Sequence, residues 1–225
     1  EGELTGLEDY VSNMKDGQKE IYYAIGSDRD SLAESPYTEA LKKAGYEVAL
    51  LTDPVDEWSV EALRDFKGKK LVSAMRADVK LPDAANEKDK KARDVSLGPV
   101  LKKAREVLGN RVSEVRTSDR LTDSAACLVL PEGAPHLYME RVLKETGRSQ
   151  GEAKRILEVN PTHPLVVALE TLCERKADDP RLSDWIEVLY DQALLTEGRA
   201  PEDPNRFAKR VTALLAQVAG SAAGG

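Results

Sequence analysis

The chain has 225 residues, which is long for one compact domain and suits two. Its net charge of −7 disfavours nucleic acid as a partner, because that kind of binding requires clustered Lys and Arg. Hydrophobic residues make up 41% of the chain, yet no run approaches the roughly 20 apolar residues of a membrane helix, so we expect no membrane partner.

The opening residues bear on the compartment. They read Glu-Gly-Glu-Leu and show neither the basic start nor the apolar segment of a secretory signal, so we expect a cytoplasmic protein. The chain begins at Glu1 rather than at a methionine, and we expect it to be a piece of a longer protein.

Residues 1–76 carry the pattern of a small α/β domain. Three apolar runs predict buried strands, at residues 21–25, 48–51 and 71–75. A helical pattern at 7–15 precedes them, a second at 35–45 separates the first two, and a third surrounds Val60. Strands that are buried on both faces favour a parallel sheet covered by helices. The expected fold here is a small parallel α/β/α sandwich.

Residues 77–94 are crowded with charged side chains and have little apolar periodicity. This composition predicts a charged linker between domains that becomes helical toward its end.

Residues 95–219 predict a second domain of α+β class. A helix ends at Leu108, and an amphipathic helix around 137–143 is stopped by Gly147. Three strands are predicted, at residues 112–116, 127–130 and 155–159. Apolar and polar residues alternate along these strands. This pattern indicates a mixed three-stranded sheet that packs with helices and has one solvated face.

Three helices are predicted to close the chain, with Thr162, Asp179 and Asp203 as their caps. Apolar residues recur at spacings of three and four in the last two of them. Such wide stripes favour a C-terminal helical dimerisation bundle shared with a second copy, and the alternative is packing onto the domain's own strands. The predicted interface residues are Leu182, Trp185, Ile186, Leu189, Leu194, Phe207, Val211, Leu214 and Leu215. Residues 220–225 are predicted to form a flexible tail.

Conventional catalytic chemistry finds little support in the sequence. His136 and His163 stand beside prolines at predicted helix starts, which favours turn or cap roles. Cys127 and Cys173 fall in apolar patterns and are expected to be buried and reduced. The turn that begins at Gly26 lacks the glycine spacing of a phosphate loop. We therefore predict no catalytic residue and no metal site.

Two apolar features are open to two interpretations. Trp58 follows a proline turn and is either an exposed platform for a partner or a half-buried side chain of the small domain. Met139 and Leu143 lie on a stripe that either faces the core or offers an adaptable binding surface. Periodicity alone does not choose between these alternatives.

Several phrases of this sequence are not generic packing patterns and read like a family signature. The phrases are Leu-Glu-Asp-Tyr-Val at 7–11, Lys-Asp-Gly-Gln-Lys at 15–19, Ser-Asp-Arg-Leu-Thr-Asp-Ser at 118–124, Leu-Glu-Val-Asn-Pro-Thr-His-Pro-Leu at 157–165, Leu-Tyr-Asp-Gln-Ala-Leu-Leu at 189–195 and Glu-Asp-Pro at 202–204. They resemble the heat-shock protein 90 chaperone family, in its bacterial, high-temperature protein G type. The resemblance runs from about residue 7 to residue 218, over both predicted domains.

The resemblance implies a fragment that covers the end of the middle domain and the C-terminal dimerisation domain. The family's ATPase site would lie upstream, so we expect no enzyme activity and no cofactor in this piece, and ATP and magnesium in the full-length protein. The implied partners are a second copy, as a homodimer, and unfolded or partly folded client proteins. By position, the resemblance assigns client contact to Trp58, Met139 and Leu143.

Two details depart from parts of the family. Pro135 and His136 stand where bacterial relatives carry further apolar residues, so the start of the client-contact surface is expected to differ in shape. The chain ends in Ala and Gly and lacks the acidic recognition tail of eukaryotic cytosolic members, which favours a bacterial type.

Two other functions compete with the chaperone hypothesis. One is a flavodoxin-like signalling or binding module fused to an unrelated helical dimerisation domain, which leaves the phrases at 118–124 and 157–165 unexplained. The other is an enzyme that uses Cys127 or His163, for which the sequence offers the least support.

Overall fold

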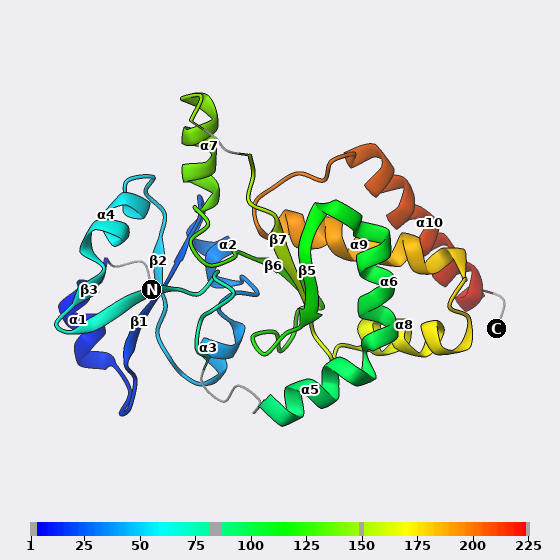
Figure 1. Cartoon of the computed structure of the whole chain (residues 1–225), viewed down its shortest axis with the longest axis horizontal. Coiled ribbons are helices and arrows are strands. Elements are labelled where there is room, and N and C mark those ends of the chain that lie inside the picture. Colours follow the sequence, from blue (N-terminus) through cyan, green and yellow to red (C-terminus); the bar gives the residue numbers. More distant parts are fainter. Residues whose placement is uncertain (1–3, 82–86, 149–150, 224–225) are drawn as a thin grey trace.

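The computed structural model of the chain describes residues 4–81, 87–148 and 151–223, and Figure 1 shows two sheets that lie side by side with helices around them. The first sheet has the strand order β2-β1-β4-β3 and the second the order β5-β7-β6. This arrangement confirms the expected mixture of α/β and α+β structure.

The first unit begins with helix α1 and alternates strands with helices. Strand β1 pairs in parallel with β2 and with β4, as the apolar runs predicted. The bounds are α1 Leu7–Asn13, β1 Glu20–Ile25, α2 Arg29–Ala33, α3 Glu39–Lys43, β2 Ala49–Leu51, α4 Asp56–Leu63, β3 Asp65–Phe66 and β4 Lys69–Ser73.

Two short elements of this unit were not predicted from the sequence. Strand β3 has two residues and pairs antiparallel with β4, so it carries no apolar run that would reveal it. Helix α2 has five residues and is capped by Asp28, whose carboxylate accepts a hydrogen bond from the Ser31 amide at 2.8 Å. The predicted helix at 35–45 is shorter than expected, because the Ser35 hydroxyl accepts from the Tyr37 amide in a turn before α3.

The second unit contains the mixed three-stranded sheet that was predicted. Strand β7 pairs in parallel with β5 and antiparallel with β6. The charged segment before it is helical from Glu87. The bounds are α5 Glu87–Ser96, α6 Gly98–Leu108, the 3-10 turn η1 Gly109–Arg111, β5 Val112–Thr117, β6 Ala126–Val129, α7 Leu137–Glu145, β7 Arg155–Val159, α8 Pro164–Arg175, α9 Pro180–Thr196 and α10 Pro204–Ala223.

One face of the second sheet is covered by α6 and α9, which Figure 1 shows crossing beside it. Leu128 and Leu157 from the strands share a hydrophobic cluster with Ile186 and Leu189 from α9. All four side chains are 4% exposed or less. Burial of this apolar surface is the main favourable contribution to the stability of this unit.

The other face of the second sheet is covered by the first unit. Tyr37, Leu41 and Met75 share a second cluster with Val129 and Ile156. Every residue of β6 and β7 is therefore buried, and the prediction of one solvated face is wrong. The alternation in the sequence could not reveal that a preceding unit supplies the cover.

Hydrogen bonds cross this junction between buried groups. The Tyr37 hydroxyl donates to the Leu128 carbonyl at 2.6 Å. Beyond β4, the backbone pairs with the second unit, since the Ala77 amide donates to the Leu130 carbonyl at 2.8 Å and the Leu130 amide to the Met75 carbonyl at 3.0 Å. The start of the charged segment is thus joined to the second sheet.

The phrase at 118–124 serves this junction. Arg120 is 1% exposed and donates to the carbonyls of Ala74 and Arg76 in the first unit. Its Nε lies 2.8 Å from the Glu158 carboxylate, which also accepts from Arg116. Burial alone would raise the pKa of Glu158, but Arg120 and Arg116 hold it below its ordinary value. A buried charge needs such partners.

A second carboxylate fixes the same phrase from the other unit. Glu39, in the first turn of α3, accepts hydrogen bonds from the amides of Thr122 at 2.6 Å, Asp123 at 3.0 Å and Ser124 at 3.1 Å. The Ser124 carbonyl accepts from the Asn160 side chain at 3.0 Å, which links this loop to the phrase at 157–165. These two phrases therefore have structural roles at the junction of the two units.

Candidate functional site

Helix α4 presents an aromatic side chain to solvent. Trp58 is 53% exposed, and Val55 and Leu63 on either side are 58% and 43% exposed. Large aromatic side chains are usually mostly buried, so exposure on this scale is informative. Trp58 is thus open to solvent over about half of its surface, and its use by a partner stays a prediction.

Glu57, the neighbour of Trp58, fixes α4 to α7. Its side chain is fully buried, and its two oxygens accept from the backbone amides of His136 at 2.9 Å and Met139 at 3.1 Å. Burial raises the pKa of this carboxyl, and the two amides oppose the rise. A carboxylate at a helix N-terminus also interacts favourably with the helix dipole. Glu57 thus caps α7 from another helix, 79 positions earlier in the sequence.

Helix α7 projects from the body of the molecule in Figure 1. Met139 and Leu143 are half-buried and four positions apart, so they share one face of the helix. Between them, Glu140 is buried and accepts two hydrogen bonds from Arg155 of β7, at 2.7 and 2.8 Å. Helix α7 is therefore anchored at its start by Glu57 and on its inner side by Arg155.

The predicted dimer contacts on α9 lie in different surroundings. Leu182, Ile186, Leu189 and Leu194 are between 0% and 4% exposed and pack within the chain's own clusters. Trp185 is half-buried against the cluster that contains Leu182. The stripe of α9 is thus covered by the chain itself, by its own sheet and by helices α6 and α8.

The stripe on α10 is largely open. Leu214 is 9% exposed, whereas Leu215 and Val218 are 63% and 62% exposed. Phe207 and Val211 are half-buried. These residues recur at spacings of three and four, which places them along one side of the helix. We call Phe207, Val211, Leu215 and Val218 the α10 face.

Ion pairs hold α10 on α9. Arg210 of α10 lies 3.2 Å from Asp184 and 3.4 Å from Glu187, and Arg111 donates to Glu187 at 2.7 and 2.9 Å. Burial alone would raise the pKa of Glu187, but the Arg111 and Arg210 guanidinium groups hold it below its ordinary value. The position of α10 depends on these side chains and on Leu214.

The helix ends confirm two of the three predicted caps. Asp179 accepts from the Arg181 amide at 3.0 Å, and Asp203 accepts from the Arg206 amide at 3.0 Å. The prediction that Thr162 caps α8 is wrong. His163 caps this helix, and its Nδ1 accepts a hydrogen bond from the Leu165 amide at 3.1 Å. The Thr162 hydroxyl instead donates to Asn160.

The two cysteine thiols lie in surroundings that lower their reactivity. Cys127 and Cys173 are buried, as predicted, and burial raises the pKa of both thiols. A thiol with a raised pKa is a poor nucleophile. Among the described residues, no group of three or more His, Cys, Asp or Glu side chains is placed to hold a metal ion. None of the helices in the described ranges is long and apolar enough for a membrane span.

These observations define a mixed α/β protein whose exposed apolar side chains include Trp58 on α4 and Leu215 and Val218 on α10. The family model described as "Hsp90 protein" matches residues 1–223. The chain therefore belongs to the Hsp90 family, as the resemblance of its phrases predicted.

Individual relatives are consistent with this assignment. The chain is 51% identical over 223 residues to "Chaperone protein HtpG" of Myxococcus xanthus, a match that covers 98% of this chain and 34% of the relative. It is 44% identical to the protein of the same name from Geobacter sulfurreducens, over 99% of this chain and 35% of the relative, and 42% identical to that of Bdellovibrio bacteriovorus, over 97% and 35%. The chain spans about a third of the length of these relatives.

Proposed function

We propose that this chain is the C-terminal part of an ATP-dependent molecular chaperone of the cytoplasm. In this proposal it joins two copies constitutively and supplies part of the surface that contacts client proteins. The observation that carries it is the match to the Hsp90 family over both units, which argues against an unrelated module fused to a dimerisation domain. The relatives' names support the chaperone activity.

The client-contact surface is proposed to comprise Trp58, Met139 and Leu143. Exposed Trp58 and half-buried Met139 belong to two helices that Glu57 holds together, which supports a common surface rather than two separate ones. Aromatic and methionine side chains adapt to many apolar partners, so weak and broad binding is expected.

The dimer contact is proposed to centre on the α10 face. Side chains such as Leu215 and Val218 would lose contact with water against a second copy, whereas the covered residues of α9 would hold the helix pair from behind. An obligate interface of this kind commonly buries on the order of 2,000 Å² or more. Joining the copies here would raise the effective concentration of upstream domains for each other to about the millimolar range.

ATP hydrolysis is proposed to belong to the part of the full-length protein that precedes this chain, where ATP and magnesium would bind. In that scheme residues 1–76 form the end of the middle domain, 77–94 the charged linker and 95–219 the dimerisation domain. In this proposal the isolated chain is not an enzyme. Its role is to hold two copies together, to position the upstream domains and to contact client proteins.

Client contact is tested by Trp58→Ala combined with Met139→Ala. Binding of a permanently unfolded probe, reduced carboxymethylated α-lactalbumin, should weaken about tenfold, as for the loss of two apolar contact residues. Fluorescence anisotropy measures the affinity. Val95→Ala is the matched control, because Val95 is an exposed apolar residue on α5. Equal affinity of the double variant and the control would refute the assignment.

Dimerisation is tested by sedimentation equilibrium. The unmodified chain should be a dimer, and Leu215→Asp with Val218→Asp should produce a folded monomer, because charges would be buried without partners. Val167→Asp provides a control, since Val167 is 43% exposed on α8. If the unmodified chain stays monomeric at all concentrations, the proposed dimerisation is contradicted.

A further inference from the structure

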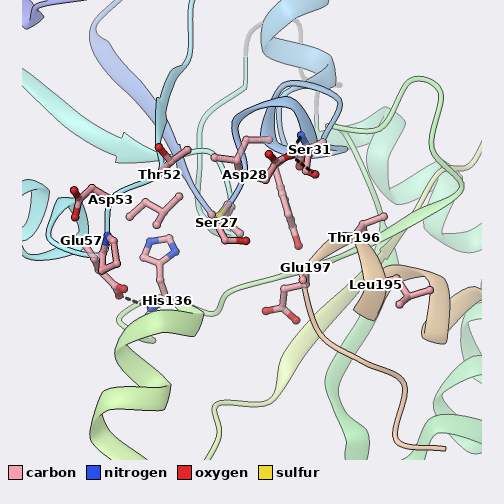
Figure 2. Close-up of a pocket in the computed structure, with 18 residues that line it drawn as sticks. Ser27, Asp28, Ser31, Thr52, Asp53, Glu57, His136, Leu195, Thr196 and Glu197 are labelled. Carbon is pink, nitrogen blue, oxygen red and sulfur yellow. Dashed lines mark hydrogen bonds between the residues drawn. The ribbon is translucent and has the colours of Figure 1, made fainter. Parts of the chain in front are cut away.

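His136 stands at the N-cap position of α7, and its side chain is only 3% exposed. Neither ring nitrogen has a hydrogen-bond partner among the residues that the structure describes, and both are shielded from solvent. Figure 2 shows the ring rising from the start of α7 toward the loops after β1 and β2, in the wall of a cavity between the two units. Buried polar groups normally find partners, so this imidazole is a point at which the folded chain is easily destabilised.

A positive charge on this ring is opposed by its surroundings. Burial lowers the pKa of His136 to about 3, and the positive charges of Arg76, after β4, and Arg155, on β7, add to the effect. The ring is therefore neutral in the folded chain at any pH well above 3. A histidine in an open segment has a pKa of about 6.5, so the open segment takes up a proton that the folded one excludes.

The carboxylates around the ring do not compensate for these cations. Four of them line the same cavity, and none accepts a hydrogen bond from the ring: Asp28, Asp53, Glu57 and Glu197. Glu57 uses both oxygens for backbone amides of α7, and Glu197 and Glu140 bind Arg155. From β1, the ring centroid of Tyr23 lies 6.3 Å from that of the imidazole, and burial raises the pKa of this phenol. Protonation of His136 therefore gains no partner in the folded chain.

Helix α7 is the element that must move for a proton to reach the ring. It projects from the body of the molecule (Figure 1), and Glu57 holds its first turn through the amides of His136 and Met139. The Glu140 amide donates to the His136 carbonyl at 3.0 Å, so the same turn depends on the position of His136. Projecting segments with few anchors can open locally without unfolding of the rest. Opening of this turn places the imidazole in water.

We propose that the first turn of α7, residues 136–140, is an acid-sensitive latch, in which protonation of His136 releases this turn from α4 while the rest of the chain stays folded. Because the pKa of His136 is lower in the closed latch than in the open one, the stabilisation is complete above about pH 6.5 and is lost as the pH falls from there toward 3.

Glu57 titrates with the opposite consequence. Its pKa is raised in the folded chain, mainly by burial, so its protonation on acidification favours the closed latch. Release of the latch would also free Met139 from the helix that carries Trp58. That consequence for client contact rests on the proposed function, whereas the opening of the latch does not.

Amide hydrogen exchange on the whole chain at pH 7 and pH 5, corrected for intrinsic exchange, tests the inference. The amides of Met139 and Glu140 report opening of the latch. The Asn160 amide, which donates to the Ala125 carbonyl at 2.9 Å, reports the rest of the fold. His136→Phe keeps an aromatic ring and cannot be protonated. From pH 7 to pH 5, the latch opening constant of the unmodified chain should rise about twentyfold relative to that of His136→Phe, and the Asn160 amide should not share this rise.

A control variant and a second measurement accompany this comparison. His163→Asn removes the other histidine and keeps an N-cap acceptor for α8, so it should leave the pH dependence of the latch unchanged. NMR of the unmodified chain with carbon-13-labelled histidine should show a neutral His136 ring at pH 5. This measurement does not depend on the folding of His136→Phe.

Three results would overturn the inference. One is the same pH dependence of the Met139 and Glu140 amides in the unmodified chain and in His136→Phe. Another is a His136 ring that becomes charged with a midpoint near pH 6.5 in the folded chain, because its protonation would then not favour the open latch. The third is an equal rise at the Asn160 amide, which would mean that acid unfolds the whole chain. Exchange involves no client, so the client-contact proposal can fail, in its own test, without affecting these outcomes.

Discussion

Helices α9 and α10 have the same apolar periodicity but different surroundings. The stripe of α9 contains Ile186, which is 1% exposed beneath the chain's own sheet, whereas that of α10 contains Leu215, which is 63% exposed. Periodicity thus predicts that a helix has a face to bury but does not say what buries it. The difference separates residues that stabilise one copy from residues that remain available to a second.

The largest expected effect on stability comes from removing the first unit, which covers the face of the second sheet that α9 does not cover. A chain that starts at residue 95 loses the first unit, which exposes Val129 and Ile156 and leaves Arg120 without its carbonyl partners. It should lose cooperative urea unfolding and bind a hydrophobic dye, because these costs exceed the margin of a typical domain. A chain without residues 220–225 is the control. Cooperative unfolding at an unchanged midpoint would show that the second unit does not need this cover.

Ile186→Ala should be the most damaging single truncation on this helix pair. It removes apolar volume from a closed core and should lower the free energy of unfolding by about 2–5 kcal/mol. Urea denaturation measures the change. A loss below about 0.5 kcal/mol, the range of surface substitutions, would mean that the α9 stripe is not a core.

Glu187→Gln tests the link between the two helices. Glu187 accepts from Arg111 and lies 3.4 Å from Arg210, so the variant should cost about 1–2 kcal/mol, between the values for exposed and buried pairs. Glu106→Gln is the control, since its exposed pair with Lys102 is 4.0 Å long. If the two variants lower the free energy of unfolding equally, Glu187 does not link α9 to α10.

The same carboxylate gives a pH dependence. Because the pKa of Glu187 is lower in the folded chain than its ordinary value of 4.5, its contribution is present above pH 4.5. That contribution disappears as the pH falls through the lower, folded value. Urea denaturation between pH 7 and pH 3 should show a steeper loss in the unmodified chain than in Glu187→Gln. If the free energy of unfolding falls with pH equally in both chains, Glu187 is not the source of this pH dependence.

The smallest expected effect belongs to Leu215→Ala. Measured below the concentration at which copies associate, its free energy of unfolding should change by less than about 0.5 kcal/mol, because the side chain is already in water. Urea denaturation at low chain concentration makes the measurement, with Ile186→Ala beside it. If Leu215→Ala lowers the free energy of unfolding as much as Ile186→Ala does, the stripe of α10 is as buried within one copy as that of α9.

The sequence predicted the elements whose apolar pattern is local. Residues 71–75 and 155–159 correspond to β4 and β7, and the helix around 137–143 is α7. The amphipathic pattern of α7 and the stop at Gly147 need only neighbouring residues to be recognised. The family resemblance rested on contiguous phrases and was confirmed over 1–223.

Features that depend on distant residues were missed. Glu57 was one acidic residue among many, and its role appears only when α7 brings its amides to the carboxylate. Similarly, the buried second face of β6 and β7 depends on Tyr37 and Leu41 from the other unit. No periodicity within one strand encodes a cover that comes from nearly a hundred residues away.

Arg155 links helix α7 to the end of helix α9. It is 2% exposed and binds Glu140 on α7 and Glu197 at the end of α9 at the same time. A tilt of α7 would therefore break charge-assisted bonds in a dry environment unless the end of α9 moves with it. Arg155 of β7 thus ties the position of α7 to that of the end of α9, the helix that precedes α10 in the chain.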